Sequence, residues 1–431
     1  MCSLIIIEIS SVNMACGQNA FSRSHSLKKI QIVLSDAIIM PVAKRNILLR
    51  YHGVDEFASS RLTIIFESSN KRTFAFIHDG HMSTFFCNAN GRKVMEDSAK
   101  ASSESIFWHG FGLILPLSVI YGNIFSGIWT LAGIVLALGL YPLIDLLSPQ
   151  TIPIRSANES PQKWLILLNI HVFLQTIAVV TLLWRAHEDQ FAWTTFCAAL
   201  STAMNSGISG IVNAHELGHR KKGTFMWWLA RLNLYTVLYS HFTTEHNHGH
   251  HRHYATDLDP VSAPKGRGLW THILQAIPRQ LFSALKVHDD RGRKGMQNPV
   301  LRGYLVQILM LISLWWFLGH WVLLAFVIQA SIAIFLLEYV NYIQHYGLRR
   351  EIGEKHTYLH SWESRSAWSR WTLLELPLHP AHHLKASLPL WELEGYEKAP
   401  QMPSGYFALF WPCMFPPIWR RLMDNRIPQE T

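Results

Sequence analysis

Cysteine is scarce in this sequence, and its spacing excludes two kinds of domain. The 431 residues include five cysteines, which form none of the closely spaced pairs that zinc ribbons use. The same scatter, from Cys2 to Cys413, gives no disulfide framework. We also expect no secretion signal, because the apolar run at residues 4–7 is short and Glu8 interrupts it.

Charged residues are few as well, at 16% of the chain, and acidic residues are fewer than basic ones. The net charge of +9 suits an anionic membrane face or an acidic partner. No nucleic-acid partner is expected, because the basic residues form no single stripe. Apolar residues make up 49% of the chain, yet its mean hydropathy is only +0.12, which predicts a membrane part joined to a large polar part.

Residues 1–105 differ from the rest of the sequence because they show no persistent helical or strand period. We interpret them as an N-terminal extension of unknown role. The extension is either a small accessory segment or disordered, or it results from a start codon upstream of a true start near Met95. Residues 106–431 form the second predicted domain.

Six apolar segments dominate the second domain, and each is close to the roughly 20 residues that a helix needs to cross the hydrocarbon core. Several are nearly free of charge and bordered by tryptophan, which argues against buried helices of a soluble protein. The sequence therefore predicts an all-α, multi-pass membrane protein with six transmembrane helices. The segments are residues 106–125, 127–147, 164–184, 191–214, 303–319 and 321–342.

Lysine and arginine predict the orientation of these helices. The links at residues 122–127 and 319–320 contain neither, whereas the basic run from Lys265 to Lys294 and the pair Arg420 and Arg421 lie on the other side. Positive loops face the cytoplasm. We therefore expect a protein of the inner or plasma membrane, with both termini and a histidine-rich cap in the cytoplasm.

Histidines concentrate in a few short stretches, of which residues 245–253 (EHNHGHHRH) are the densest. Neutral imidazole binds zinc, copper and iron. One metal with an open position uses three or four ligands, so nine candidates suggest two metals. The nine are His215, His219, His246, His250, His251, His345, His379, His382 and His383.

Polar residues near these histidines are candidates for a supporting role. Four of them could orient a ligand through a hydrogen bond, namely Glu216, Glu245, Glu338 and Asn341. We expect His248 and His253 to point away from the metals. His109 and His171 lie inside predicted spans and are expected to be packing residues.

Two alternatives from other classes start from the same histidines. His215-Glu216-x-x-His219 matches the zinc-protease signature, in which glutamate is the general base. A protease needs only one further ligand, however, and leaves the other clusters unexplained. A metal transporter should carry its ligands near the middle of the membrane, whereas these clusters lie at or beyond the helix ends.

The motifs HELGHR (215–220), EHNHGHH (245–251), NYIQHYGL (341–348) and HPAHH (379–383) resemble the histidine boxes of the integral-membrane alkane 1-monooxygenases. That family belongs to the membrane di-iron group of fatty-acid desaturases and hydroxylases. The resemblance implies two iron ions held by the nine histidines, with no further catalytic residues. It also implies O2 as co-substrate, a primary alcohol as product, and electrons from an NAD(P)H reductase through rubredoxin or a ferredoxin-type carrier.

The sequence departs from the family at several positions around the boxes. Gln344 replaces the usual glutamate, and Pro377-Leu378 and Pro380-Ala381 replace the usual residues around the first histidine of the last box. These departures leave methyl hydroxylation of an alkylbenzene and fatty-acid desaturation as alternatives. An alkyl substrate is bound by apolar burial, at roughly 0.8 kcal/mol per CH2. The small residues Ala137 and Gly139 are candidates to line its cavity.

Overall fold

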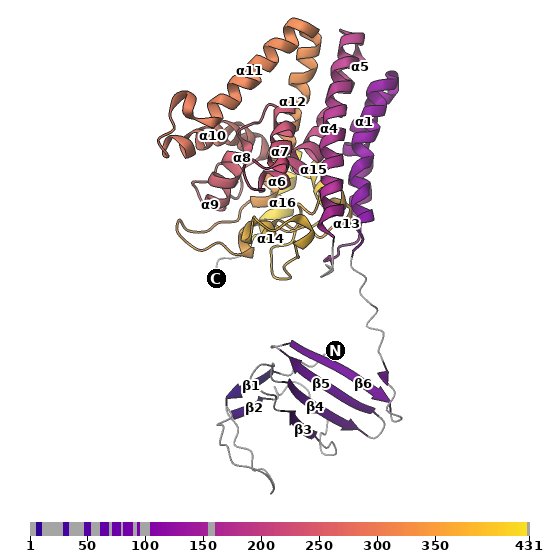
Figure 1. Ribbon diagram of the computed structural model, residues 1–431, viewed down its shortest axis with the longest axis vertical. Helices are drawn as coiled ribbons and strands as arrows, with labels where there is room; N and C mark the ends of the chain where they lie inside the picture. Colours follow the sequence, from indigo (N-terminus) through magenta and orange to yellow (C-terminus); the bar gives the residue numbers. More distant parts are fainter. Residues whose placement is uncertain are drawn as a thin grey trace. The chain divides into compact units, whose positions relative to one another are not determined.

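The computed structural model describes residues 104–153 and 160–428, together with the backbone of seven short strands before residue 95. The chain divides into two compact units, Met1–Ala101 and Ser102–Thr431. The described elements of the first unit are strands, and those of the second are helices, as the ribbon diagram shows (Figure 1). The expected all-α class therefore describes the second unit only. Both chain termini, which we expected in the cytoplasm, lie outside the described residues.

The first unit contains two antiparallel sheets, contrary to our expectation that these residues lack a strand period. One sheet pairs β1 with β2, and the other orders β3 to β7 as they follow in the chain. The missed signal is Asp79-Gly80, since this dipeptide favours a two-residue hairpin turn and His78 pairs with His81 across it. The strands are β1 (Ile6–Ser10), β2 (Lys29–Val33), β3 (Ile47–His52), β4 (Arg61–Ser68), β5 (Lys71–His78), β6 (His81–Asn88) and β7 (Lys93–Val94).

The second unit is built around long, nearly upright helices (Figure 1). Among the described residues, five helical stretches are long and apolar enough to cross a membrane. They are Ile106–Phe125, Gly127–Leu147, Pro161–Asp189, Pro299–Leu318 and His320–His345. The first comprises η1 (Ile106–Leu113) and α1 (Ile114–Phe125), and the second runs from η2 (Gly127–Leu131) through α2 (Ala132–Ile134) and η3 (Val135–Leu140) to α3 (Tyr141–Leu147). The others are α4 (Pro161–Asp189), α11 (Pro299–Leu318) and α12 (His320–His345).

The remaining predicted span is helical, but it does not reach the apolar character of the other five. It runs without a break through α5 (Trp193–Asn205), η4 (Ser206–Ile211) and α6 (Val212–Gly218). Its polar side chains are buried against neighbouring helices. Asn205 donates to Gln175 at 2.8 Å, and Ser206 donates to Gln329 at 2.8 Å. Because these groups bond to protein rather than to water, a polar helix is stable at the centre of the bundle.

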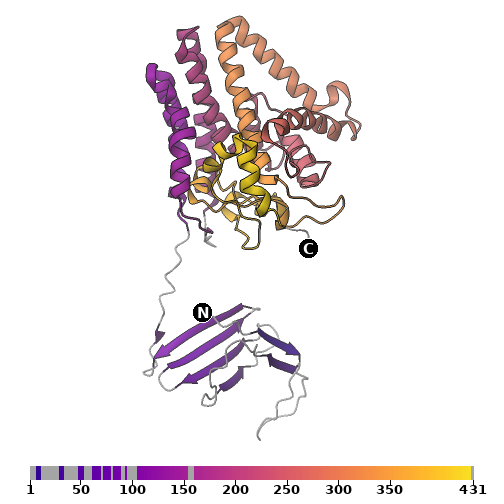
Figure 2. The ribbon, with the colours of Figure 1, turned by 180° about the vertical axis from the view of Figure 1, so that it is seen from behind.

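Further helices, most of them short, form a cap over one end of the bundle, and the C-terminal ones are in front in the view from behind (Figure 2). The buried carboxylate of Asp145 fastens this cap to α3, because it accepts hydrogen bonds from Ser369 Oγ at 3.0 Å and Ala408 N at 3.1 Å. Gly405 is required beside it, since a Cβ there would overlap the carboxylate of Asp145. The cap helices are α7 (Phe225–Thr236), α8 (Phe242–Glu245), η5 (His246–His250), α9 (His251–His253), α10 (Leu269–Asp289), α13 (Ala367–Thr372), α14 (His379–Leu384), α15 (Tyr406–Met414) and α16 (Pro416–Met423), with short turns at η6 (Gly295–Gln297), η7 (Tyr358–His360), η8 (Leu390–Glu392) and η9 (Asp424–Arg426).

Candidate metal centre

The densest histidine stretch adopts a π-helical turn, η5, between α8 and α9. A π-turn bonds residue i to residue i+5 and is wider than an α-turn. The widened turn brings His246, His250 and His251 to the inner side of the segment. His248 falls on the opposite side and is exposed. Gly249 leaves room in this turn, because a Cβ there would lie 2.5 Å from Glu245 Oε1 and 2.8 Å from Ser283 Oγ and would displace these side chains.

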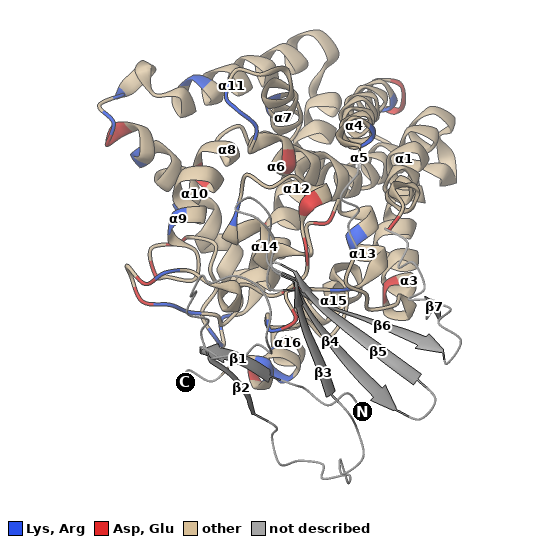
Figure 3. Ribbon diagram, turned by 60° about the horizontal axis from the view of Figure 1, so that its bottom comes forward, with Lys and Arg blue, Asp and Glu red and all other residues tan. Residues whose placement is uncertain are grey.

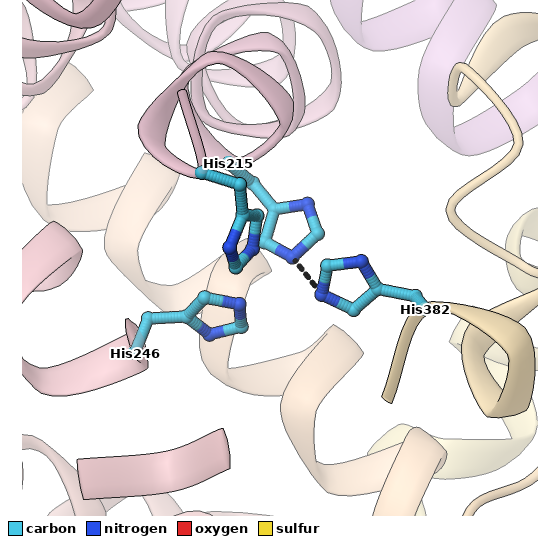
Figure 4. A group of neighbouring side chains, drawn as sticks. His215, His246 and His382 are labelled. Carbon is cyan, nitrogen blue, oxygen red and sulfur yellow. Dashed lines mark hydrogen bonds between the residues drawn. The ribbon is translucent and has the colours of Figure 1, made fainter. Parts of the chain in front are cut away.

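Four histidines from three parts of the chain form the first group that could hold a metal ion. His215 and His219 come from the end of α6, His246 from η5 and His382 from α14. One ring nitrogen of each lies within 4.8 Å of the others. The rings converge on a common point, and Nε2 of His215 lies 3.0 Å from Nε2 of His382 (Figure 4).

A second group of four lies beside the first and is completely buried. His250 comes from η5, His345 from the end of α12, and His379 and His383 from α14. The distance between Nε2 atoms is 3.0 Å for His345 and His379, and 2.8 Å for His379 and His383. His345 therefore lies at the end of a bundle helix, whereas the other three histidines of the group lie in the cap.

His251 belongs to neither group of four, but it lies between them. Its Nε2 is 3.1 Å from Nε2 of His246 and 3.0 Å from Nε2 of His382, and its ring centroid is 4.6 Å from that of His383. The structure therefore brings all nine predicted histidines together. Eight fall into two groups of four, and the ninth bridges them.

The chemistry of this donor set fits metal ions. Burial, followed by the neighbouring histidines, lowers the pKa of His246, His382 and His383 well below the usual value, so these rings are neutral at pH 7. A neutral imidazole has one N–H donor and one nitrogen lone pair, so two facing rings can form one hydrogen bond. Where several Nε2 atoms face one another, some lone pairs have no donor. Nε2 of His219, for example, is buried without a hydrogen bond. Cations between the rings would satisfy these lone pairs.

One acidic residue near the cluster was missed by the sequence reasoning. Oδ2 of the buried Asp259 lies 3.0 Å from Nδ1 of His250, and it also accepts from Ser262 Oγ at 2.5 Å. A carboxylate in this position fixes the tautomer and the orientation of a metal-binding histidine. The Asp-Pro pair at 259–260 was the available signal, but its link to His250 exists only in the folded chain.

The four candidates for orienting a ligand make other contacts in the described part of the chain. Glu216 pairs with Arg220 at 2.8 Å. Glu245 accepts from Ser283 at 3.3 Å, and Glu338 accepts from Gln280 at 2.8 Å. Asn341 lines a small cavity beside the first group, and no hydrogen bond joins any of the four to a cluster histidine. Their role in orienting ligands therefore remains a prediction.

The histidines expected outside the site are placed elsewhere, and neither metal group includes them. His248 is exposed and His253 half-buried. Inside the bundle, Nε2 of His109 lies 2.7 Å from Oε1 of Glu375. His171 has Nδ1 2.7 Å from Oγ of Ser209, so both have a partner other than a metal.

Two small cavities connect the bundle interior with the histidines. The inner cavity is lined by His215, His246 and His379. The outer cavity is apolar and is lined by Ala137. Both share the wall residues Gly207, Val212 and Val340, so they lie next to each other. Ala137 therefore occupies the position we expected, whereas Gly139 does not line either cavity.

Comparisons with known proteins agree with this site. Residues 191–412 match the fatty acid desaturase family. Alkane 1-monooxygenase 1 of Pseudomonas aeruginosa is 32% identical over 322 residues, covering 69% of this chain and 83% of the relative. Alkane 1-monooxygenase 1 of Alcanivorax borkumensis is 30% identical over 318 residues, covering 70% and 78%. The xylene/toluene monooxygenase hydroxylase component XylM of Pseudomonas putida is 29% identical over 234 residues, covering 52% and 62%.

The helices and the histidine groups define an integral-membrane metalloenzyme of the desaturase and hydroxylase class. Within that class, the chain belongs to the alkane 1-monooxygenase family. It is an O2-dependent monooxygenase, an oxidoreductase that acts on a hydrophobic substrate and takes electrons from a partner. The resemblance drawn from the four histidine motifs is therefore confirmed.

Proposed function

We propose that this protein inserts one oxygen atom of O2 into a terminal C–H bond of an alkane or alkyl chain and releases a primary alcohol. Two electrons and two protons reduce the second oxygen atom to water. The observation that carries the proposal is the pair of histidine groups, found in a chain whose relatives are named alkane 1-monooxygenases. Two iron ions held by the nine histidines would bind and reduce O2.

The residues around the histidines would position the substrate and exclude water. The outer cavity is walled by apolar and aromatic side chains such as Leu336 and Phe407, which suit a chain without a polar handle. The two cavities have volumes of about 20 and 40 Å3. Since a water molecule needs about 10–15 Å3 by this measure, a chain enters only when side chains move apart. Val212 and Val340 line both cavities, so these side chains would have to move for a chain to pass from one to the other.

We further propose that the helix from Trp193 to Gly218 is the sixth span and that the metal site faces the cytoplasm. α12 supports this arrangement because it has 26 residues and ends at His345. At about 1.5 Å per residue it is roughly 39 Å long, more than the ~30 Å of the hydrocarbon core. The histidines therefore lie beyond one membrane face, and the basic loops predict that this face is cytoplasmic.

The electron donor is proposed to be an acidic rubredoxin or ferredoxin-type protein, reduced by an NAD(P)H reductase. A surface hollow of about 710 Å3 supports this partner, because it is lined by Arg252, Arg279 and Lys286. His248 and Gly249 of η5 also line it, so a docked carrier would lie against the turn that holds two cluster histidines. In the ribbon coloured by charge, basic residues lie near α9 and α10, with acidic residues among them (Figure 3). Complementary charge speeds such an encounter.

The comparisons do not favour the alternatives. XylM is named as a xylene/toluene monooxygenase hydroxylase component, but it matches a shorter part of this chain than Alkane 1-monooxygenase 1 of Pseudomonas aeruginosa does. A zinc protease would use one group of ligands and leave the second buried without a metal. Desaturation remains the other reaction to distinguish by experiment.

Cells that express the protein with a rubredoxin and its reductase test the proposal when given n-alkanes and alkylbenzenes under 18O2. We expect primary alcohols that carry 18O, and no product with His382→Ala, which removes a histidine of the first group. His356→Ala is the matched control, because this half-buried histidine is in neither group and does not line the hollow proposed for the carrier. Alkenes without 18O, or oxidation of alkylbenzenes alone, would contradict the proposal.

A further inference from the structure

A second surface hollow, of about 660 Å3, lies between α7 and the start of α11. This volume falls within the ~300–1,000 Å3 of ordinary ligand sites. The described residues that line the hollow include six lysines and arginines, but no aspartate or glutamate. The six are Arg220, Lys222, Arg231, Arg291, Arg293 and Arg302. A hollow with this lining attracts an anion.

Most of these cations lack an acidic partner in the described part of the chain. Arg220 pairs with Glu216 at 2.8 Å. Arg231 instead lies over the Trp227 ring, 5.1 Å from its centroid, and no salt bridge is formed by Arg231 or Arg302 among the described residues. An isolated group of like charges is unfavourable, and a bound anion would relieve the repulsion.

Buried polar atoms in the wall of the hollow also lack a partner. Thr243 and His288 both line it and are 7% and 5% exposed. Oγ1 of Thr243 and Nδ1 of His288 have no hydrogen bond. Buried polar atoms normally have a hydrogen-bond partner, so the lack of a partner at these two atoms needs an explanation. A ligand with several acceptor oxygens, such as a phosphate, would reach both atoms only if the neighbouring groups that cover them move aside.

The surroundings of the hollow indicate where such a phosphate comes from. α11 is the least buried of the five apolar stretches. Within its most apolar 18-residue segment 17% is buried, whereas the corresponding share for α12 is 44%. Both ribbon views show α11 inclined away from the upright helices (Figures 1 and 2). Leu305 and Leu309 are exposed along it, and Trp228 on α7 is exposed beside the hollow. These apolar surfaces suit acyl chains, and Arg302 lies in the first turn of α11, at headgroup level.

We propose that this hollow binds the phosphate headgroup of an anionic phospholipid whose acyl chains lie along α11. The headgroup would connect α7 and α11 with α8 and η5, since Thr243 and Asn247 also line the hollow. Basic pockets between membrane helices bind anionic headgroups in the same way. None of the nine cluster histidines lines this hollow.

The test is native mass spectrometry of the full-length protein with equal amounts of phosphatidylglycerol and phosphatidylcholine. We expect the protein to retain phosphatidylglycerol preferentially. Each arginine near an anionic headgroup contributes about 1 kcal/mol, roughly fivefold in affinity. Arg231→Gln with Arg302→Gln should therefore weaken phosphatidylglycerol binding by about 25-fold. The matched control, Arg420→Gln with Arg421→Gln, removes the same charge from exposed positions on α16 and should leave binding unchanged.

Further measurements distinguish a lipid headgroup in the hollow from free phosphate or a docked electron carrier. Metal content shows whether each variant is folded, and Lys222→Gln, at an exposed position, should weaken binding about fivefold without a risk to folding. Equal losses in both arginine pairs would overturn the proposal. Displacement of the lipid by millimolar inorganic phosphate would assign the hollow to free phosphate. Weaker rubredoxin binding in the Arg231 and Arg302 variant, with lipid binding unchanged, would assign it to the carrier.

Discussion

Asp259→Asn tests whether the carboxylate that contacts His250 supports the metal site. Burial alone would raise the pKa of Asp259, but His250 and the hydrogen bonds from His250 and Ser262 outweigh it and hold the pKa below its ordinary value. The side chain is therefore ionised at neutral pH. Asparagine keeps the shape and one acceptor oxygen but removes the charge that fixes the imidazole of His250.

The expected effect follows from the single 3.0 Å contact between Asp259 Oδ2 and His250 Nδ1. Loss of a hydrogen-bonded partner of a metal-binding histidine lowers metal affinity about 10- to 100-fold. That factor corresponds to roughly 1.4–2.8 kcal/mol. Because the seven other histidines of the two groups are untouched, we expect weaker metal binding rather than an empty site.

The assay is the rate and midpoint of iron loss from purified protein during titration with a chelator. Asp257→Asn is the matched control, because its side chain is 91% exposed and forms only a 3.6 Å pair with Arg349. We expect the Asp259 variant to lose iron at about 10- to 100-fold lower chelator concentration than the control. Identical curves for the two variants would refute the role of this carboxylate.

The other histidines and the apolar cavity give three further expected outcomes. His345→Ala removes a fully buried histidine of the second group and should lose iron and hydroxylation, whereas His248→Ala, at an exposed position, should keep about two irons per chain, as a two-metal site requires. Full iron and activity in His345→Ala would exclude that residue from the site. Ala137→Trp fills the outer cavity and should shorten the longest alkane that is oxidised, while an unchanged chain-length profile would place this face outside the substrate path. Burial, Arg220 and His250 lower the pKa of His219 to about 4. Since unfolded histidine takes up a proton near pH 6.5, the Tm of metal-free protein should fall between about pH 7 and 5, and a constant Tm would contradict this.

The residue types and their order determined much of this protein. Nine imidazoles in four short motifs predicted a candidate metal site, because neutral imidazole nitrogens bind metal ions, and the structure brings all nine together. Length and apolar composition identified five spans, since a lipid environment demands about 20 apolar residues from each helix. The sixth helix was found by the same reasoning, although Asn205 and Ser206 make it too polar to meet that criterion.

Only the tertiary structure decided how the histidines are grouped. The π-turn at η5 sends His246 to one group and His250 to the other, and an ordinary helical period does not predict that widened turn. His251 lies between the groups because its ring contacts His219 and His382 of the first group and His383 of the second. The contact between Asp259 and His250 likewise depends on how the chain after α9 folds back. Motif spacing specifies which nitrogens are available, but the distances between them arise from packing of segments that are far apart in the sequence.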